Sequence, residues 1–311
     1  MSNFAMVFPG QGSQAVGMLA DLATAFPIVE ETFKQASDVL GYDLWDLVQN
    51  GTAEDLGQTQ RTQPALLASS VAIYRVWQQK YPELKPSVMA GHSLGEYSAL
   101  VCAGVLNFQD AIKLVELRGN AMQQAVPAGT GAMYAIIGLD NEAIINACEQ
   151  AQAEVGEIVS AVNFNSPGQV VIAGTKAAAE KAGELCKAAG AKRALPLAVS
   201  VPSHCALMKP AADKLAEALQ NITLNAPVVP VINNVDVSVE TDAEAIRNAL
   251  VHQLYSPVRW TETVEKMANE GVTTLYEIGP GKVLTGLAGR IVKELNAKAV
   301  NDVASLEAVT Q

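Results

Sequence analysis

AGHSLGEYSALVCAG, residues 90–104, follows the short apolar run SVMAG (87–91) and leads into a helix-like segment. Gly91 and Gly95 flank Ser93 in a G-x-S-x-G pattern. In a nucleophile elbow, two such glycines allow a sharp strand-to-helix turn that lifts the serine hydroxyl above the sheet edge. A plain glycine-rich turn is the alternative, because the bare pattern arises by chance in about one chain of this length in ten. The strand-turn-helix context favours the nucleophile.

Short apolar runs alternate with amphipathic segments on both sides of this stretch. The runs typical of strands are 4–8, 87–91, 227–235 and 273–279. The segments typical of helices are 27–41, 63–80, 93–104, 108–125, 205–220, 242–254, 259–270 and 282–295. Strands that alternate with helices indicate an α/β fold with a mainly parallel sheet.

The middle of the chain has a different order of elements. It predicts strand, helix, strand, strand, helix and strand, at 131–139, 141–152, 157–165, 169–175, 176–189 and 191–199. This β-α-β-β-α-β order is that of a ferredoxin-like unit. We therefore expect a small domain over 128–199, inserted in a larger α/β domain formed by 1–127 and 200–311.

Composition excludes several classes of function. The 311 residues carry a net charge of −11, which argues against a nucleic-acid-binding protein. The four cysteines are far apart and form no C-x-x-C pair, so neither a disulfide framework nor a metal site is expected. No signal peptide or membrane-spanning run is visible. The sequence thus predicts a soluble, cytoplasmic protein.

A serine nucleophile requires a base, and the chain has three histidines. His92 precedes Ser93 on the turn, where packing is the expected role. His252 lies within a helical segment. His204 follows a strand-like run at the start of a helix, where catalytic residues of α/β proteins gather, so it is the preferred base. No acidic residue presents itself to orient it, and a backbone carbonyl can serve instead.

Arg118 lies on the apolar face of the predicted helix 108–125, together with Leu114, Val115 and Met122. A buried guanidinium without an anion is costly. Two interpretations are open. Arg118 forms an ion pair with an internal carboxylate, or it is a two-pronged donor for a carboxylate of the substrate.

Two glycine-containing loops are further candidates. FPGQGSQAVG (8–17) fits G-x-G-x-x-A, but no second strand with an acidic end follows, so a dinucleotide site is not favoured. The loop can still line a pocket with its backbone N–H groups and the Gln11 amide. Gly279-Pro280-Gly281 precedes a helix and is interpreted as a turn, with an anion site as the alternative.

These stretches together resemble the malonyl-CoA:acyl carrier protein transacylases of fatty-acid synthesis, and more widely the acyltransferase domains of polyketide synthases. The matching segments are FPGQGSQ (8–14), TQPALLASS (62–70), GHSLGEYSAL (91–100), LRGNAMQ (117–123), NFNSPGQVVIAG (163–174), VPSHCALM (201–208) and EIGPGKVLTGL (277–287). They cover essentially the whole chain in order.

The resemblance implies a hydrolase-like large domain with the ferredoxin-like insertion. It also implies a ping-pong transfer of malonyl from malonyl-CoA to the phosphopantetheine thiol of acyl carrier protein. We expect no cofactor and no metal, no nucleic-acid or membrane partner, and a monomer. The carrier protein is acidic in this family, so a local basic patch is expected, for which Lys187, Lys192 and Arg193 are candidates.

The resemblance also assigns roles to individual residues. By it, Ser93 carries the malonyl ester and His204 is the general base and acid. The remaining positions are the oxyanion-hole N–H groups of Gln11 and Leu94, the malonate-binding Arg118, the His-orienting carbonyl of Gln253, and Gln63 and Asn163 as pocket lining.

Two rival functions remain. A serine esterase or thioesterase on a similar fold would want an acidic triad member and would not need Arg118. A carrier-protein-binding scaffold would keep the fold without the chemistry, and it would not need Ser93, His204 and Arg118 together.

Overall fold

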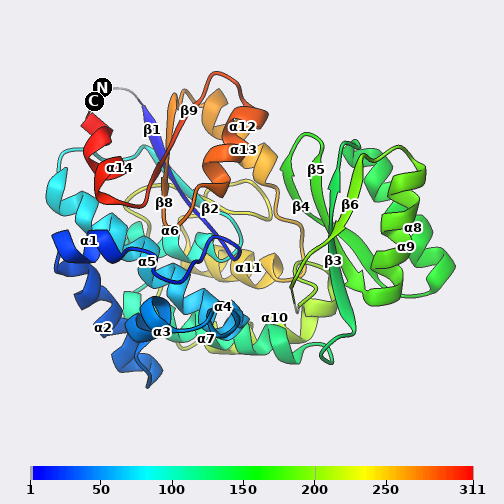
Figure 1. Ribbon diagram of the computed structural model, residues 1–311, viewed down its shortest axis with the longest axis horizontal. Helices are drawn as coiled ribbons and strands as arrows, with labels where there is room; N and C mark the ends of the chain where they lie inside the picture. Colours follow the sequence, from blue (N-terminus) through cyan, green and yellow to red (C-terminus); the bar gives the residue numbers. More distant parts are fainter. Residues whose placement is uncertain (1–2, 200, 311) are drawn as a thin grey trace.

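The computed structural model describes residues 3–199 and 201–310. Its larger sheet has five parallel strands in the order β7-β2-β1-β8-β9 (Figure 1). These strands are β1 (Phe4–Phe8), β2 (Val88–Gly91), β7 (Val231–Ile232), β8 (Thr274–Ile278) and β9 (Asn296–Val300). The expected α/β fold with a parallel sheet is confirmed.

The sequence of β1 explains how the large sheet is buried on both faces. Successive strand residues point to opposite faces. Phe4, Met6 and Phe8 pack into one hydrophobic core, whereas Ala5 and Val7 pack into a second core on the other face. A strand buried on both sides is apolar throughout rather than alternating, as FAMVF is.

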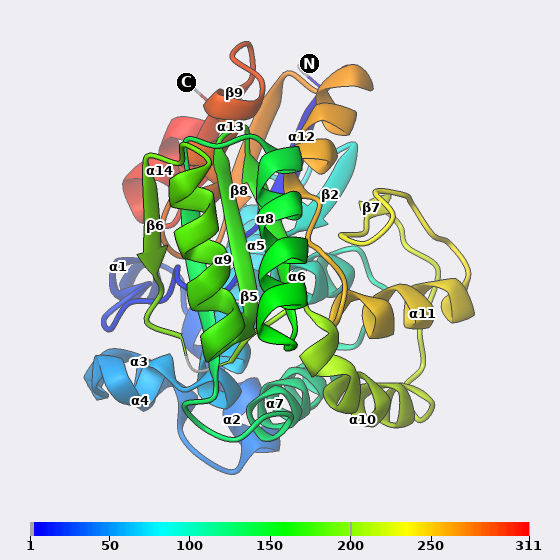
Figure 2. The same cartoon turned by 90° about the vertical axis from the view of Figure 1, so that its right-hand side faces the viewer.

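Helices form the layers that cover this sheet (Figures 1 and 2). The helices that precede the second sheet are α1 (Ala20–Ala25), α2 (Ile28–Leu40), α3 (Leu44–Asn50), α4 (Ala53–Gly57), α5 (Thr59–Lys80), α6 (Gly95–Cys102) and α7 (Phe108–Gln124). Those that follow it are the 3₁₀ turn η1 (Ala206–Met208), α10 (Lys209–Leu219), α11 (Ala243–Gln253), α12 (Trp260–Asn269), α13 (Val283–Ile291), α14 (Val303–Glu307) and the 3₁₀ turn η2 (Ala308–Thr310). Residues of α12 and α13 line the second core, opposite α5 and α6.

Two expected elements differ most from the structure. The strand expected over 227–235 is only β7, because Pro227 and Pro230 supply no N–H for a sheet ladder. The helix expected over 282–295 ends at Ile291, and the chain then forms the edge strand β9, which the sequence did not reveal.

The second sheet is antiparallel and has the order β4-β5-β3-β6. Its elements follow along the chain as β3 (Gly131–Ile137), α8 (Asn141–Val155), β4 (Val159–Ser166), β5 (Gln169–Thr175), α9 (Lys176–Ala188) and β6 (Arg193–Pro196). Both helices cover one face (Figure 2). The other face packs on Cys205, next to His204. The ferredoxin-like order of elements is confirmed.

The segment between α11 and α12 connects the two sheets. Val258 donates its N–H to the Val162 carbonyl (2.8 Å) and accepts from the N–H of Phe164 (3.0 Å), so it pairs with β4 as a short parallel bridge. The second sheet is thereby held beside the carboxyl ends of the large parallel sheet. Ligands of open α/β sheets bind at such an edge.

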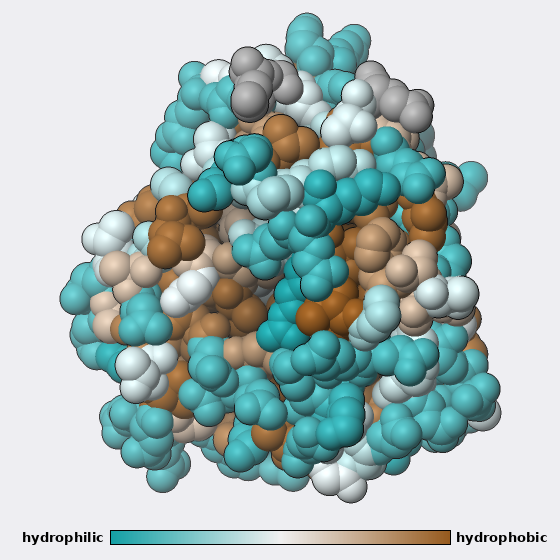
Figure 3. Space-filling model, turned by 90° about the vertical axis from the view of Figure 1, so that its left-hand side faces the viewer, coloured by the Kyte–Doolittle hydropathy of each residue, from teal (hydrophilic) through white to brown (hydrophobic). Residues whose placement is uncertain are grey.

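The face formed by the N-terminal helices and α14 is mostly hydrophilic, with hydrophobic side chains in separate patches (Figure 3). All four cysteines are buried free thiols. Among the residues that the structure describes, no helix is both long and apolar enough to span a bilayer.

Candidate active site

Ser93 lies on a strained turn between β2 and α6. Its φ is 52°, a left-handed conformation that few residues other than glycine adopt. The glycines on either side have no room for a side chain: a Cβ at Gly91 would collide with the Gly95 backbone, and one at Gly95 would collide with the Phe8 carbonyl. The G-x-S-x-G stretch is therefore shaped by backbone packing into the geometry of a nucleophile elbow.

His204 faces Ser93 from the loop that precedes η1. Its Nε2 lies 2.7 Å from the Ser93 Oγ, and its Nδ1 lies 2.8 Å from the Gln253 carbonyl oxygen. A carbonyl only accepts, so Nδ1 carries the proton and Nε2 is free to accept the serine proton. His204, like Ser93, has a positive φ, of 63°.

The electrostatic surroundings keep His204 neutral. Burial, and then the nearby Arg118 guanidinium, lower the pKa of His204 to about 3, whereas the hydrogen bond to Gln253 acts in the opposite direction. The imidazole is thus unprotonated over the physiological pH range, as a general base must be before it accepts a proton.

Arg118 is buried beside Ser93 and has only neutral acceptors. Its Nη1 donates to the Gln63 Oε1 (2.8 Å), and its Nη2 donates to the Gln253 Oε1 (3.0 Å) and reaches the Ser93 Oγ at 3.4 Å. The guanidinium also lies over the Tyr97 ring, 5.3 Å from its centroid.

The charge of Arg118 is not balanced by a direct contact. Within the described ranges it forms no ion pair within 4.0 Å, so the expected alternative of an internal salt bridge is wrong. Its Nε is buried without a hydrogen-bond partner. Burial lowers the pKa of Arg118, since the charged form lacks the solvation of water. A ligand carboxylate would complete this site.

The loop after β1 brings Gln11 to the same edge of the sheet. A Cβ at Gly10 would lie only 2.6 Å from the His92 carbonyl oxygen, which shows how closely this loop approaches the elbow. Leu94 follows Ser93 at the N-terminus of α6. The Gln11 side chain accepts from Thr59 (3.2 Å), which in turn accepts from Gln63 (2.9 Å).

A cavity opens outward from Gln11. It has a volume of about 410 Å³. Its walls come from the α4–α5 region, α7 and the chain after β6, and they are formed by Gln11, Glu54, Gly57, Gln58, Gln60, Gln123, Ala198 and Val199.

His92 and Asn163 take a less direct part in the site. The His92 Nε2 lies 2.8 Å from the Asn165 Oδ1, and the His92 ring packs on Trp260, so His92 ties the elbow to β4. Asn163, also on β4, has a buried Oδ1 without a hydrogen-bond partner. In the described part of the chain, no hydrogen bond joins Asn163 to Ser93. The His252 ring packs against the Tyr255 ring.

Three groups of the site were missed in the sequence: Asn234, Glu96 and the side chain of Gln253. The Asn234 Oδ1 accepts from the Ser93 N–H (2.8 Å), and its Nδ2 donates to the Gly91 carbonyl (2.7 Å), so it clamps the elbow on both sides of the serine. Asn234 follows β7, and a polar residue after a parallel strand was the signal that could have revealed it.

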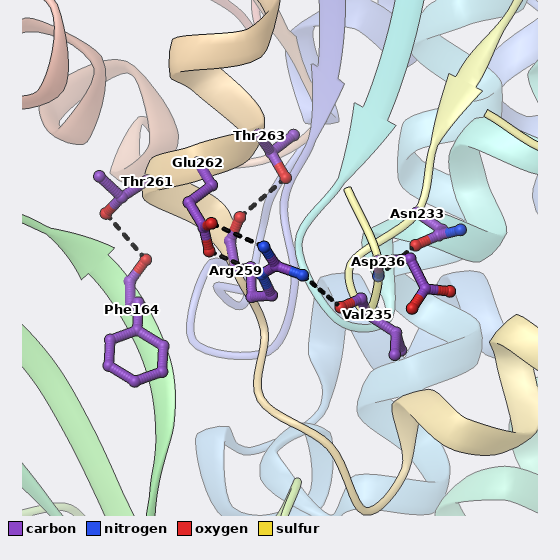
Figure 4. A network of polar contacts seen from close by, with 8 residues as sticks. All are labelled: Phe164, Asn233, Val235, Asp236, Arg259, Thr261, Glu262 and Thr263. Atoms are coloured by element: carbon purple, nitrogen blue, oxygen red, sulfur yellow. Dashed lines mark hydrogen bonds and ion pairs between the residues drawn. The ribbon is translucent and has the colours of Figure 1, made fainter. Parts of the chain in front are cut away.

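A polar network holds the Asn234 loop in place (Figure 4). Arg259 donates to the Val235 carbonyl (3.2 Å) and forms a bidentate pair with Glu262, with both contacts at 2.6 Å. The Thr261 hydroxyl donates to the Phe164 carbonyl on β4 (3.0 Å). One short segment therefore anchors both the elbow clamp and the second sheet.

The chemistry that this arrangement supports is acyl transfer through a serine. Within residues 3–199 and 201–310, no group of three or more His, Cys, Asp or Glu side chains could hold a metal ion. Instead, Ser93 is surrounded by the base His204, by the backbone of the tight turn and by the buried cation Arg118.

Comparison with known proteins assigns the family. The acyl transferase domain matches residues 5–310. The malonyl CoA-acyl carrier protein transacylase of Haemophilus influenzae is 76% identical over 311 residues, which cover 100% of this chain and 99% of that protein. The chain belongs to the malonyl CoA-acyl carrier protein transacylases.

Solved structures agree with this assignment. The 1.7 Å crystal structure of an acyl carrier protein S-malonyltransferase from Vibrio cholerae superposes with a TM-score of 0.97 at 71% identity, covering 99% of this chain and 100% of that one. A malonyl-transacylase in complex with its type II polyketide synthase acyl carrier protein also has a TM-score of 0.97 and 71% identity, covering 99% and 98%. The enzyme is thus an acyl-carrier-protein S-malonyltransferase.

Proposed function

We propose that Ser93 carries the malonyl group as an ester between two thiols. The enzyme transfers malonyl from malonyl-CoA to acyl carrier protein, and the hydrogen bond of 2.7 Å between the Ser93 Oγ and the His204 Nε2 is the observation that carries the assignment of nucleophile and base. In the first half-reaction, His204 takes the Ser93 proton as Oγ attacks the thioester carbonyl. The tetrahedral intermediate collapses, His204 returns the proton to sulfur, and coenzyme A leaves as a thiol.

The oxyanion of that intermediate faces two backbone N–H groups, those of Gln11 and Leu94. The left-handed φ of Ser93 and the close approach of the Gly10 loop to the His92 carbonyl support this role. In the second half-reaction the carrier-protein thiol attacks the ester carbonyl, His204 accepts the thiol proton, and Ser93 regains it on release.

Arg118 holds the malonyl carboxylate. Its two terminal nitrogens contact only neutral oxygens, those of the Gln63 and Gln253 amides and the Ser93 hydroxyl, so a substrate carboxylate supplies the missing anion. Burial lowers the pKa of His204 most, and the Arg118 charge lowers it further; pairing with the malonyl carboxylate offsets that charge, so the base is strengthened when a malonyl group is bound. We assign Gln63 to aligning Arg118 and Asn163 to the pocket wall.

The esterase alternative differs in how His204 is oriented. The His204 Nδ1 faces the backbone carbonyl of Gln253, at the position where a hydrolase of this type would have a carboxylate. The lifetime of the acyl-enzyme in water tests the choice. We expect slow hydrolysis without a thiol and rapid discharge with acyl carrier protein, whereas rapid hydrolysis would identify an esterase.

The carrier protein and the cell compartment complete the proposal. One relative has been solved bound to an acyl carrier protein. Lys187 and the neighbouring Arg193 supply positive charge for such an acidic partner. The Lys187 Nζ donates to the Lys192 carbonyl (3.1 Å).

The four reduced cysteines fit a cytoplasmic location. We also propose 128–199 as the inserted domain.

A further inference from the structure

Glu96 is a buried carboxyl group that the proposed mechanism does not use. It lies on α6, three residues after Ser93, and is 2% exposed. Its Oε2 accepts from the Gln253 Nε2 (2.8 Å) and from the Asn234 backbone N–H (3.1 Å). Both partners contact Ser93, so one intervening residue separates Glu96 from the reacting groups.

The Gln253 amide has a single favourable orientation here. Its Nε2 donates to the Glu96 Oε2, the Asn234 Oδ1 (3.1 Å) and the Ser93 carbonyl (3.0 Å). Its Oε1 accepts from the Arg118 Nη2 (3.0 Å). A flipped amide would set oxygen against three acceptors and nitrogen against a guanidinium that only donates.

Glu96 is the acceptor that fixes this orientation most firmly. An amide nitrogen has two hydrogens, and the contact to Glu96 is the shortest of the three. The Glu96 Oε2 keeps accepting even when Oε1 is protonated, so the arrangement survives a change in charge. The same Gln253 also presents its backbone carbonyl to His204.

We infer that Glu96 is a positioning residue that, through Gln253, aligns Arg118 with the acyl carboxylate and thereby sets the preference for malonyl over uncharged acyl groups. The inference rests on the proposed function of Arg118. It adds that the carboxylate preference is controlled from a residue that touches neither substrate nor the arginine.

Three variants test it: Glu96→Ala, Glu96→Gln and Glu277→Ala. The readout is the ratio of the enzyme acylation rates with malonyl-CoA and acetyl-CoA, measured by intact mass. We expect Glu96→Ala to lower this ratio by about ten- to hundredfold, the effect of a lost buried hydrogen-bond network. Glu96→Gln should restore the ratio to within about threefold of wild type, because its Oε1 can accept both hydrogen bonds.

Glu277 is the matched control. It is a buried glutamate that accepts from the Leu284 and Thr285 N–H groups at the start of α13, outside the site. Glu277→Ala should lower the melting temperature and leave the malonyl-to-acetyl ratio unchanged. A ratio that falls equally in Glu277→Ala would show a general loss of packing and overturn the inference.

Two further results would overturn it: a wild-type ratio in Glu96→Ala, or a Glu96→Gln variant as impaired as Glu96→Ala. If Glu96→Ala does not fold, Gln253→Met takes its place. This variant keeps the carbonyl for His204 and removes the amide, and a wild-type ratio would again refute the role. Failure of the proposed function itself would appear separately, as absence of a malonyl adduct on Ser93 in the wild-type enzyme.

Discussion

Replacing Arg118 by methionine tests the source of acyl-group selectivity. Methionine is unbranched and apolar, so Arg118→Met fills much of the same space without the charge. Arg118 is 1% exposed, and its terminal nitrogens contact the amide oxygens of Gln63 and Gln253 at 2.8 and 3.0 Å. The variant leaves the malonyl carboxylate without a partner in a buried site.

The size of the effect follows from this burial. Removing one partner of a buried, hydrogen-bonded ion pair costs about 3–5 kcal/mol. Since about 1.4 kcal/mol corresponds to tenfold in rate, the acylation efficiency with malonyl-CoA should fall by a factor of roughly 10²–10⁴. An acetyl group has no carboxylate to lose its partner, so acetyl-CoA should react at least as fast as with the wild type.

The assay is single-turnover acylation, with malonyl-CoA and acetyl-CoA compared by intact mass. Arg118→Lys is the control, because it keeps the charge and loses the two-pronged geometry. It should fall between wild type and Arg118→Met. A malonyl-to-acetyl ratio that changes by less than tenfold in Arg118→Met would refute the carboxylate clamp.

Two further predictions concern the elbow and its buried carboxyl. Gly95→Ala should destabilise the protein by more than about 2 kcal/mol, because the added Cβ meets the Phe8 carbonyl, although alanine is normally favoured in helices by about 1 kcal/mol. Burial raises the pKa of Glu96 to about 7, and the hydrogen bonds from Asn234 and Gln253 oppose this rise only in part. The stability that this carboxyl contributes is fully present below pH 4.5 and should fall by about 3 kcal/mol as the pH rises from 4.5 to about 7, and Glu96→Gln should abolish that fall.

Both have controls in the same chain. Gly286→Ala in α13 adds a Cβ with nothing within 4 Å, so it should be neutral or stabilising in denaturant unfolding. Equal effects of Gly286→Ala and Gly95→Ala would contradict the packing argument for the elbow. For the second prediction, the melting temperatures of wild type and Glu96→Gln are compared from pH 5 to pH 9. A constant difference between the two melting temperatures over this range would contradict the buried ionisation of Glu96.

Much of the fold could be predicted because local patterns and tertiary packing agree. The elbow was predictable because Gly91 and Gly95 leave no room for a Cβ, and such a requirement is visible as glycine in the sequence. The edge strand β9 was not, because its half-exposed sequence NAKAV is short and consists mostly of Asn, Ala and Lys, which are depleted in strands. The length of β7 was overestimated because the apolar run 227–235 was interpreted without regard to its two prolines.

The site divides in the same way. Ser93 and His204 could be named from residue type and position, and Arg118 from its place on an apolar helix face. Asn234 and Glu96 were not named, since their roles depend on contacts across 138 positions or more between the elbow region and the segment after β7. A buried glutamate within the apolar stretch GEYSALVC was the one available signal for Glu96.

The central claim is that Ser93 carries the malonyl group between the two thiols. Peptide mapping after brief incubation with malonyl-CoA tests it most directly. We expect one malonyl group on the peptide that contains Ser93, no adduct in Ser93→Ala, and loss of the adduct when acyl carrier protein bearing its phosphopantetheine thiol is added. An adduct on another residue, or malonyl transfer undiminished in Ser93→Ala, would contradict it.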